Sequence, residues 1–137
     1  MRVRKLKLKT HKMKKIVHTD KAPKAIGPYS QAVIHNGVVY CSGQIPLDPE
    51  TMEIIGDNAV DQAKQVMKNL SEVLEAAGSS FDKVIKCSIF LDDMGDFGGV
   101  NEVYGEYFPS NPPARETVAV DTLPKSVLVE IGCIAYI

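Results

Sequence analysis

Two charged residues, Arg115 and Glu130, lie within runs of β-forming apolar residues close to the C-terminus. The composition of these runs predicts strands over residues 112–120 and 127–137, separated by a proline-containing link at residues 123–125. A guanidinium group matches a carboxylate in a bidentate manner, and a carboxyl group beside it can orient a water or exchange a proton with it. The pair therefore suggests an anion-binding arginine next to a proton-handling glutamate. A cross-strand ion pair that only stabilises the sheet is the alternative.

The alternation of side chains along a strand predicts which of these residues share a face. In the first run, Val118 marks the apolar face, so Arg115 and Thr117 point to the opposite one. In the second run, the odd-numbered positions are apolar, so Glu130 points away from them. If both apolar faces meet one core, Arg115, Thr117 and Glu130 share the opposite face of the sheet. Parity places Ser42 on that face as well.

The residues around this pair resemble the signature of the Rid (YjgF-type) family of reactive imine and enamine deaminases. That family is also known as the L-PSP endoribonuclease or translation inhibitor family. The resemblance covers about residues 14–137 and rests on separated segments in one order. The segments are Ile26-Gly27-Pro28-Tyr29-Ser30-Gln31, Cys41-Ser42-Gly43-Gln44-Ile45-Pro46, Asp96-Phe97 with Val100-Asn101-Glu102-Val103-Tyr104, Pro113-Ala114-Arg115, Leu123-Pro124 and Val129-Glu130-Ile131.

The resemblance implies a hydrolase that converts 2-imino or 2-enamino acids, such as 2-aminoacrylate or 2-iminobutyrate, to 2-keto acids and ammonia. It implies no metal and no organic cofactor. It also implies a homotrimer whose sheets face inward, with sites between subunits. The partners are then a small imino or keto acid and two further copies of the chain.

The site residues that the resemblance implies are two catalytic groups and several binding groups. Arg115 would hold the substrate carboxylate, and Glu130 would position the attacking water. Backbone groups near Thr117 would help to fix the substrate nitrogen. The substrate-binding residues are Tyr29, Ser42, Gly43, Asn101, Arg115 and Thr117.

Three positions depart from the family pattern. Thr117 stands where some members carry cysteine, so thiol chemistry is lost while backbone contacts are kept. Glu116 and Asp121 replace small residues, and their negative charge could repel an acidic substrate. These departures put the substrate range in question, and to a lesser degree the activity.

The periodicity of the chain predicts an α+β fold with a single mixed sheet of about six strands and two helices on one face. Asn36-Gly37 predicts a two-residue hairpin turn, and Gly78 marks the end of the longer helix. The other sheet face is also apolar, so we expect it to meet another subunit; a third covering element is the alternative. The predicted elements are strands 14–19, 32–35, 38–41, 83–91, 112–120 and 127–137, and helices 58–77 and 96–108.

The charge of the chain is unevenly distributed. Residues 1–20 hold eight of the 16 Lys and Arg residues and one of the 17 acidic residues, which leaves residues 21–137 with a net charge of −8. We interpret residues 1–13 as a basic N-terminal extension that is disordered or dispensable, and residues 14–137 as a single domain. A targeting segment or a nucleic-acid tail is the alternative for the extension. The acidic domain argues against a nucleic-acid partner.

The three cysteines, Cys41, Cys87 and Cys133, lie in apolar strand runs at long spacings. We expect buried, reduced thiols and hence a cytoplasmic protein, or a mitochondrial one if the extension is a targeting segment. No apolar run approaches the ~20 residues of a membrane span. Two other functions remain open from the sequence: an endoribonuclease or translation inhibitor, and a non-catalytic trimeric module that binds small carboxylates through Arg115.

Overall fold

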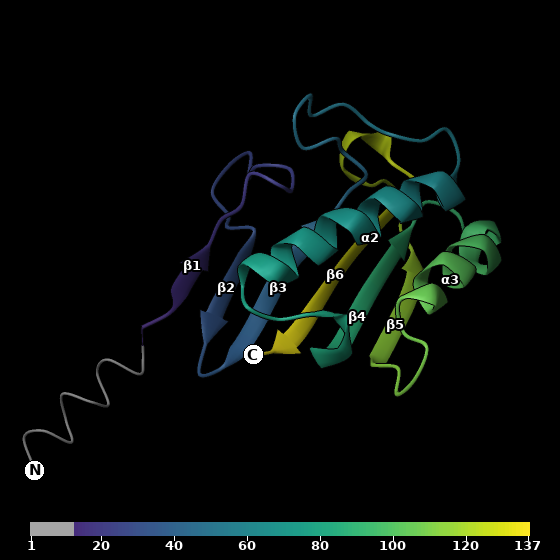
Figure 1. The fold of residues 1–137 in the computed structure, drawn as a ribbon. Coiled ribbons are helices and arrows are strands. Elements are labelled where there is room, and N and C mark those ends of the chain that lie inside the picture. The colour runs from purple at the N-terminus through teal and green to yellow at the C-terminus, as the bar shows by residue number, and fades with distance from the viewer. Residues whose placement is uncertain (1–12) are drawn as a thin grey trace, which may run out of the picture.

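The structure is a computed structural model that describes residues 13–137. The predicted basic extension lies almost wholly in residues 1–12, outside the described part. Two helices cover one face of a six-stranded sheet (Figure 1), which confirms the predicted α+β class. The elements are β1 (Lys15–Val17), β2 (Ala32–His35), β3 (Val38–Gln44), α2 (Ala59–Ala76), η1 (Phe81–Lys83), β4 (Val84–Leu91), η2 (Met94–Asp96), α3 (Phe97–Glu106), β5 (Ala114–Ala119), η3 (Pro124–Ser126) and β6 (Val129–Tyr136).

The sheet has the strand order β1-β2-β3-β6-β4-β5. All neighbours pair antiparallel except β4 and β5, which are parallel because α3 forms a crossover between them. The C-terminal strand β6 therefore lies in the middle of the sheet, between β3 and β4. β1 and β5 form its two edges.

Local sequence signals account for the element boundaries. Asn36 and Gly37 both adopt positive φ, as a type I′ turn requires, and His35 pairs with Val38 as predicted. The side chain of Asn58 caps α2 by accepting a hydrogen bond from the backbone N–H of Asp61 at 2.9 Å. Gly78, with φ 81°, ends that helix.

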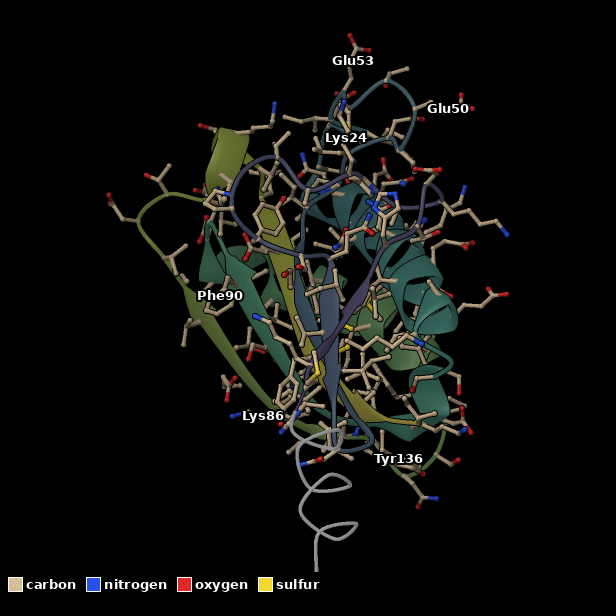
Figure 2. All side chains as sticks on the ribbon, turned by 90° about the vertical axis from the view of Figure 1, so that its left-hand side faces the viewer. Lys24, Glu50, Glu53, Lys86, Phe90 and Tyr136 are labelled. Carbon is tan, nitrogen blue, oxygen red and sulfur yellow. The ribbon has the colours of Figure 1, made fainter. Side chains whose placement is uncertain are left out.

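The core lies between the helices and the sheet face that they cover. From α2 it takes the stripe that includes Met67, Leu70 and Leu74, and from the sheet it takes residues such as Ile89 and Ile131. The opposite face is apolar but is not covered by the described residues: Tyr40, Tyr136 and Val118 are 44–48% exposed. Figure 2 shows Phe90 and Lys86 on this side, away from the helices. We call it the open face.

Two predicted side-chain orientations are wrong. Alternation along the predicted strand 83–91 places Ile85 in the core together with Cys87 and Ile89; the register of β4 against β6 shifts between Val84 and Lys86, so Ile85 is exposed instead. In β5, Arg115 pairs with the buried Cys87, and Val118 pairs with Phe90. The helix face of β5 therefore carries Arg115 and Thr117, while Val118 is on the open face. Because β5 is an edge strand, its apolar residues need not face the helices.

Among the described residues, no helix combines the length and the hydropathy that crossing a bilayer would require.

Candidate functional site

Glu130 lies in a cavity of about 420 Å³ at one end of the open face. It projects from β6 near the start of that strand, where the η3 turn leads the chain into the sheet. The loop before β2 and the end of β3 supply the other walls. The lining residues are Ile26, Tyr29, Ser42, Gly43, Ile45, Pro124, Lys125 and Glu130. Three of the predicted binding residues, Tyr29, Ser42 and Gly43, thus lie with the predicted catalytic glutamate.

A bulge in β3 allows the close approach of Glu130 to the backbone. The pairing of β3 with β6 shifts between Cys41 and Gln44. At Gly43, a Cβ atom would lie 2.9 Å from the carboxyl carbon of Glu130, so any larger residue there would displace the carboxylate from its present position. The burial that results raises the pKa of Glu130 above its ordinary value, because desolvation disfavours the charged form. Glu130 can therefore exchange a proton closer to neutral pH than an exposed glutamate can.

The two hydroxyl groups in this cavity differ in what they can offer a ligand. The Ser42 hydroxyl donates to the backbone carbonyl of Ser30 at 2.6 Å, so its proton is already used. Ser42, predicted to bind substrate, can therefore contribute its oxygen as an acceptor in this arrangement. The Tyr29 hydroxyl accepts from the N–H of Ile26 at 3.3 Å, which leaves its own proton available to a ligand.

Three buried amide side chains hold the walls of this cavity, and the sequence analysis missed them. Gln31 accepts from the N–H of Thr19 at 2.7 Å and donates to the carbonyl of Pro23 at 2.9 Å. Gln62 accepts from the N–H of Leu128 at 2.8 Å, two residues before Glu130.

Asn69 donates to the carbonyls of Ile45 and Leu47 at 3.2 and 3.0 Å. The signal in the sequence was a pair of amides, Gln62 and Asn69, seven residues apart in the buried part of a helix. Buried polar side chains need hydrogen-bond partners, and here the partners are backbone groups of the loops that line the cavity.

Arg115 lies at a second cavity, of about 360 Å³, on the helix face of the sheet. Its Nη1 donates to Oδ1 of Asn101 at 2.5 Å. Its guanidinium carbon lies 5.0 Å from the ring centroid of Tyr104 and 5.5 Å from that of Phe97. The cavity is lined by Asn101, Tyr104, Gly105, Phe108, Pro112, Pro113 and Arg115. The structure thus brings Asn101 and Arg115 together, as the resemblance implied.

The predicted site is therefore divided between two faces of the sheet. Arg115 pairs with Cys87 on the helix face, whereas Glu130 pairs with Phe90 on the open face. The expectation that both share one face within the protomer is wrong. Thr117 lies on the helix face with Arg115, and its buried hydroxyl oxygen has no hydrogen-bond partner among the described residues. The described residues thus form two separate clusters, which we call the Glu130 half-site and the Arg115 half-site.

Glu116 points away from the Arg115 half-site. It lies on the open face, where it accepts a hydrogen bond from Ser88 and pairs with Lys86 at 3.2 Å. The Ser88 hydroxyl and the Lys86 ammonium lower the pKa of Glu116. The Lys86 ammonium compensates the charge of Glu116 on the other face of the sheet. Glu116 should therefore repel a substrate bound to Arg115 less than its position next to Arg115 in the sequence suggests. Asp121 is exposed, two residues beyond the end of β5.

The three cysteines form a row across adjacent strands. Cys41 pairs with Cys133, which pairs with Cys87. All three are free thiols; Cys87 and Cys133 are buried as predicted, and Cys41 is only half-buried. Burial raises the pKa of Cys87, and the neighbouring Cys41 thiol together with burial raises the pKa of Cys133. Both buried thiols therefore remain neutral at physiological pH.

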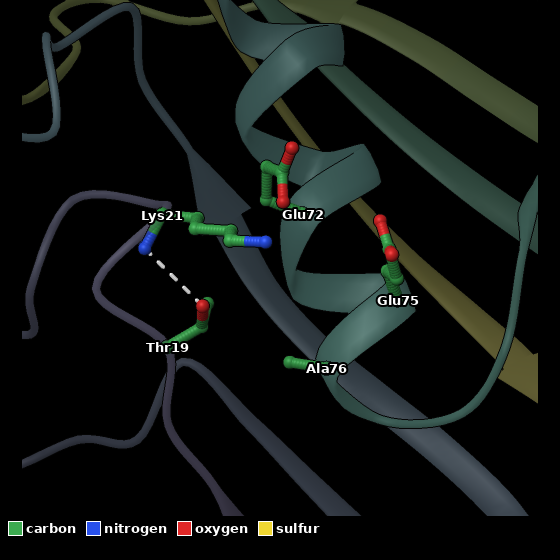
Figure 3. A pocket seen from close by; sticks show the side chains of 5 residues that line it. All are labelled: Thr19, Lys21, Glu72, Glu75 and Ala76. Carbon is green, nitrogen blue, oxygen red and sulfur yellow. Dashed lines mark hydrogen bonds between the residues drawn. The ribbon is translucent and has the colours of Figure 1, made fainter.

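Another hollow, of about 250 Å³, lies between the loop after β1 and the last turns of α2 (Figure 3). In it, the backbone N–H of Lys21 donates to the hydroxyl of Thr19 at 3.2 Å. The Lys21 side chain extends toward Glu72. The lining contains none of the predicted site residues, and we assign it no chemistry.

Comparisons with known proteins relate the chain to a family. The family model described as endoribonuclease L-PSP matches residues 19–137. Protein DfrA of Myxococcus xanthus is 56% identical over 124 residues, covering 89% of this chain and 95% of that protein. The 2-iminobutanoate/2-iminopropanoate deaminase of Mus musculus is 48% identical over 123 residues, covering 90% and 91%. The crystal structure of E. coli TdcF with bound serine has a TM-score of 0.85 and 42% identity, covering 90% and 98%.

Proposed function

Because the chain belongs to the L-PSP endoribonuclease family, which includes the Rid deaminases, we propose that it hydrolyses reactive 2-imino and 2-enamino acids to 2-keto acids and ammonia. The expected substrates are small, of the 2-aminoacrylate and 2-iminobutyrate type. Deaminase-named relatives from mouse and human, at 48% and 45% identity, support the same reaction class.

The observation that carries the proposal is the state of Arg115. Among residues 13–137, the partners of its guanidinium are all neutral: the amide of Asn101 and two aromatic rings. An exposed arginine without a carboxylate partner keeps its charge and most of its N–H groups for a ligand. A 2-imino acid offers the carboxylate that this fork fits. A structure with bound serine among the relatives is consistent with a small amino-acid-like ligand.

Glu130 has the environment of a group that handles water. In the proposed reaction the imine nitrogen is protonated, and the Glu130 carboxylate accepts a proton from a water while the water oxygen attacks the iminium carbon. Glu130 then returns this proton to the nitrogen of the carbinolamine. The C–N bond breaks as the C=O bond forms, and the hydroxyl proton passes to the departing ammonia, which leaves as ammonium. Burial raises the pKa of Glu130, so its carboxylate is a stronger base than that of an exposed glutamate. Tyr29 is placed to donate a hydrogen bond from the rim of the same cavity.

The separation of the half-sites supports a homotrimer with shared sites. One protomer cannot bring Arg115 and Glu130 to one substrate, because they point to opposite faces of its sheet. A ring of protomers repeats one contact between two different surfaces, so the Arg115 half-site of one copy can meet the Glu130 half-site of the next. The exposed apolar residues of the open face, including Tyr40 and Tyr136, supply a surface for that contact.

The family description also names a ribonuclease activity. Neither His18 nor His35, the two histidines in the described part of the chain, lines the Glu130 or the Arg115 cavity. Protein ribonucleases that work without a metal commonly rely on such side chains for acid–base chemistry. Imine hydrolysis is therefore the function that this geometry supports better.

The test is release of 2-keto acid from 2-aminoacrylate that is generated in the assay by a lyase. We expect the protein to accelerate keto-acid formation over the spontaneous rate, and Arg115→Ala to abolish the acceleration. Sedimentation should give a trimer. An unaccelerated rate with the wild-type protein, combined with cleavage of RNA, would replace the proposal by the ribonuclease function.

A further inference from the structure

We propose that Phe97, Asn101 and Tyr104 form a seat for the Arg115 guanidinium that fixes its direction while leaving its positive charge uncompensated. We call these three α3 residues the guanidinium seat. They would act as positioning residues, since they reach the substrate through Arg115. The inference rests on the proposed function for its consequences in catalysis, but the seat itself can be tested without a substrate.

The seat is one stripe of a helix. Positions 97, 101 and 104 follow the spacing i, i+4, i+7, which places three side chains on one side of α3. The guanidinium lies over two rings, at 5.0 and 5.5 Å from their centroids, within the range of cation–π attraction. Oδ1 of Asn101 accepts from Nη1 at 2.5 Å. Ring faces and one hydrogen bond together restrict both the plane and the direction of the guanidinium.

The seat is itself held rigidly. Tyr104 is 5% exposed, and its ring packs on that of Phe108 with centroids 4.7 Å apart. Arg115 is exposed on an edge strand, where a long side chain would otherwise sample many rotamers. A preset orientation lowers the entropy that ligand binding must offset.

The guanidinium seat contains no negatively charged side chain. Among residues 13–137, no carboxylate oxygen lies within 4.0 Å of the guanidinium nitrogens. The nearest acidic residue in sequence, Glu116, is paired with Lys86 on the other face. An aspartate in place of Asn101 would hold Arg115 equally well, but it would occupy the position that a substrate carboxylate needs. A neutral seat thus explains why an amide, and not a carboxylate, stands at position 101.

The first experiment needs no ligand. Arg115 is one of three arginines, with Arg2 and Arg4 outside the described residues, so its Nε–Hε signal can be assigned in an NMR spectrum. The two rings should displace this signal by their ring currents and narrow the range of its motion. Phe97→Leu should move it toward the position of a free arginine. Phe81→Leu is the matched control, because Phe81 is also half-buried and packs on Phe108, but does not contact Arg115.

The second experiment measures affinity for 2-oxobutyrate by calorimetry. We expect Phe97→Leu to weaken binding about tenfold, Phe97→Tyr to restore it because a ring is present, and Phe81→Leu to leave it unchanged. Asn101→Asp should abolish binding without lowering the melting temperature, since the new carboxylate pairs with the guanidinium.

Equal effects of Phe97→Leu and Phe81→Leu on the Arg115 signal would overturn the seat. Wild-type affinity in Asn101→Asp would overturn the requirement for a neutral acceptor. If the wild-type protein binds no keto acid and hydrolyses no imine, the proposed function fails, and the NMR comparison still decides whether the seat exists.

Discussion

Mixed trimers provide the sharpest test of a site shared between protomers. Arg115→Ala removes the guanidinium from the helix face, and Glu130→Gln removes the ionisable carboxyl group from the open face, so each variant alone should be inactive. If every site takes Arg115 from one copy and Glu130 from its neighbour, a trimer that contains both variants holds one intact site of about three. Random assembly of an equal mixture should therefore recover about one quarter of the wild-type rate per protomer.

The assay is keto-acid release after the two variants have been unfolded together in denaturant and refolded. Separately refolded variants, mixed afterwards, are the control. A second mixture also distinguishes a site shared between chains from a site within one chain. The double variant, with both changes in one chain, refolded with an equal amount of wild-type protein should retain about one quarter of the sites if they are shared, and about one half if each site lies within one chain.

No recovery in the mixture of single variants, together with half of the rate retained in the second mixture, would refute the reasoning. Arg115 and Glu130 would then have to meet within one protomer, which their pairing with Cys87 and Phe90 on opposite faces does not allow without a change in register. Recovery well above one quarter would mean that one of the two residues is dispensable.

Three further predictions concern the Glu130 half-site and the buried thiols. Burial raises the pKa of Glu130, so its contribution to stability is greatest below the ordinary value of 4.5 and is lost as the pH rises. The melting temperature of Glu130→Gln, measured relative to that of the wild type, should therefore increase from pH 4 to pH 7. A difference that stays constant over this range would show that Glu130 is not desolvated. Gly43→Ala should lower turnover by about tenfold or more, because the added methyl group displaces the Glu130 carboxylate. Gly98→Ala is the control and should leave turnover unchanged, because the space beside Gly98 on α3 is open. Equal turnover of the two variants would show that the close approach of Glu130 to the Gly43 backbone is unimportant. Cys87 and Cys133 should resist a thiol reagent at pH 8 in the native protein, since their raised pKa values keep both thiols neutral. Both should react once the protein is unfolded in denaturant. Rapid labelling of either thiol in the native protein, identified by mass spectrometry, would contradict their burial.

Much of the fold follows from local chemistry. The Asn36-Gly37 turn fixed the register of its hairpin, and Gly78 ends α2 as predicted, while Asn58 caps the start of that helix. The sequence also predicted that both sheet faces are apolar, and the open face does carry exposed apolar residues. These features depend on residues close together in the chain, so a sequence pattern suffices to predict them.

The sequence by itself determined the fold class, the family motifs and the identity of the charged residues, Arg115 and Glu130, that the motifs contain. It could not determine on which side of the sheet each of them lies. Alternation along a strand says only that neighbours point in opposite directions. Which direction faces the core depends on the strand's partners, and for the edge strand β5 the parallel pairing with β4 placed Arg115 beneath α3. Only the tertiary structure could therefore divide the site into two halves, because strand pairing and bulges join residues that are far apart in the chain.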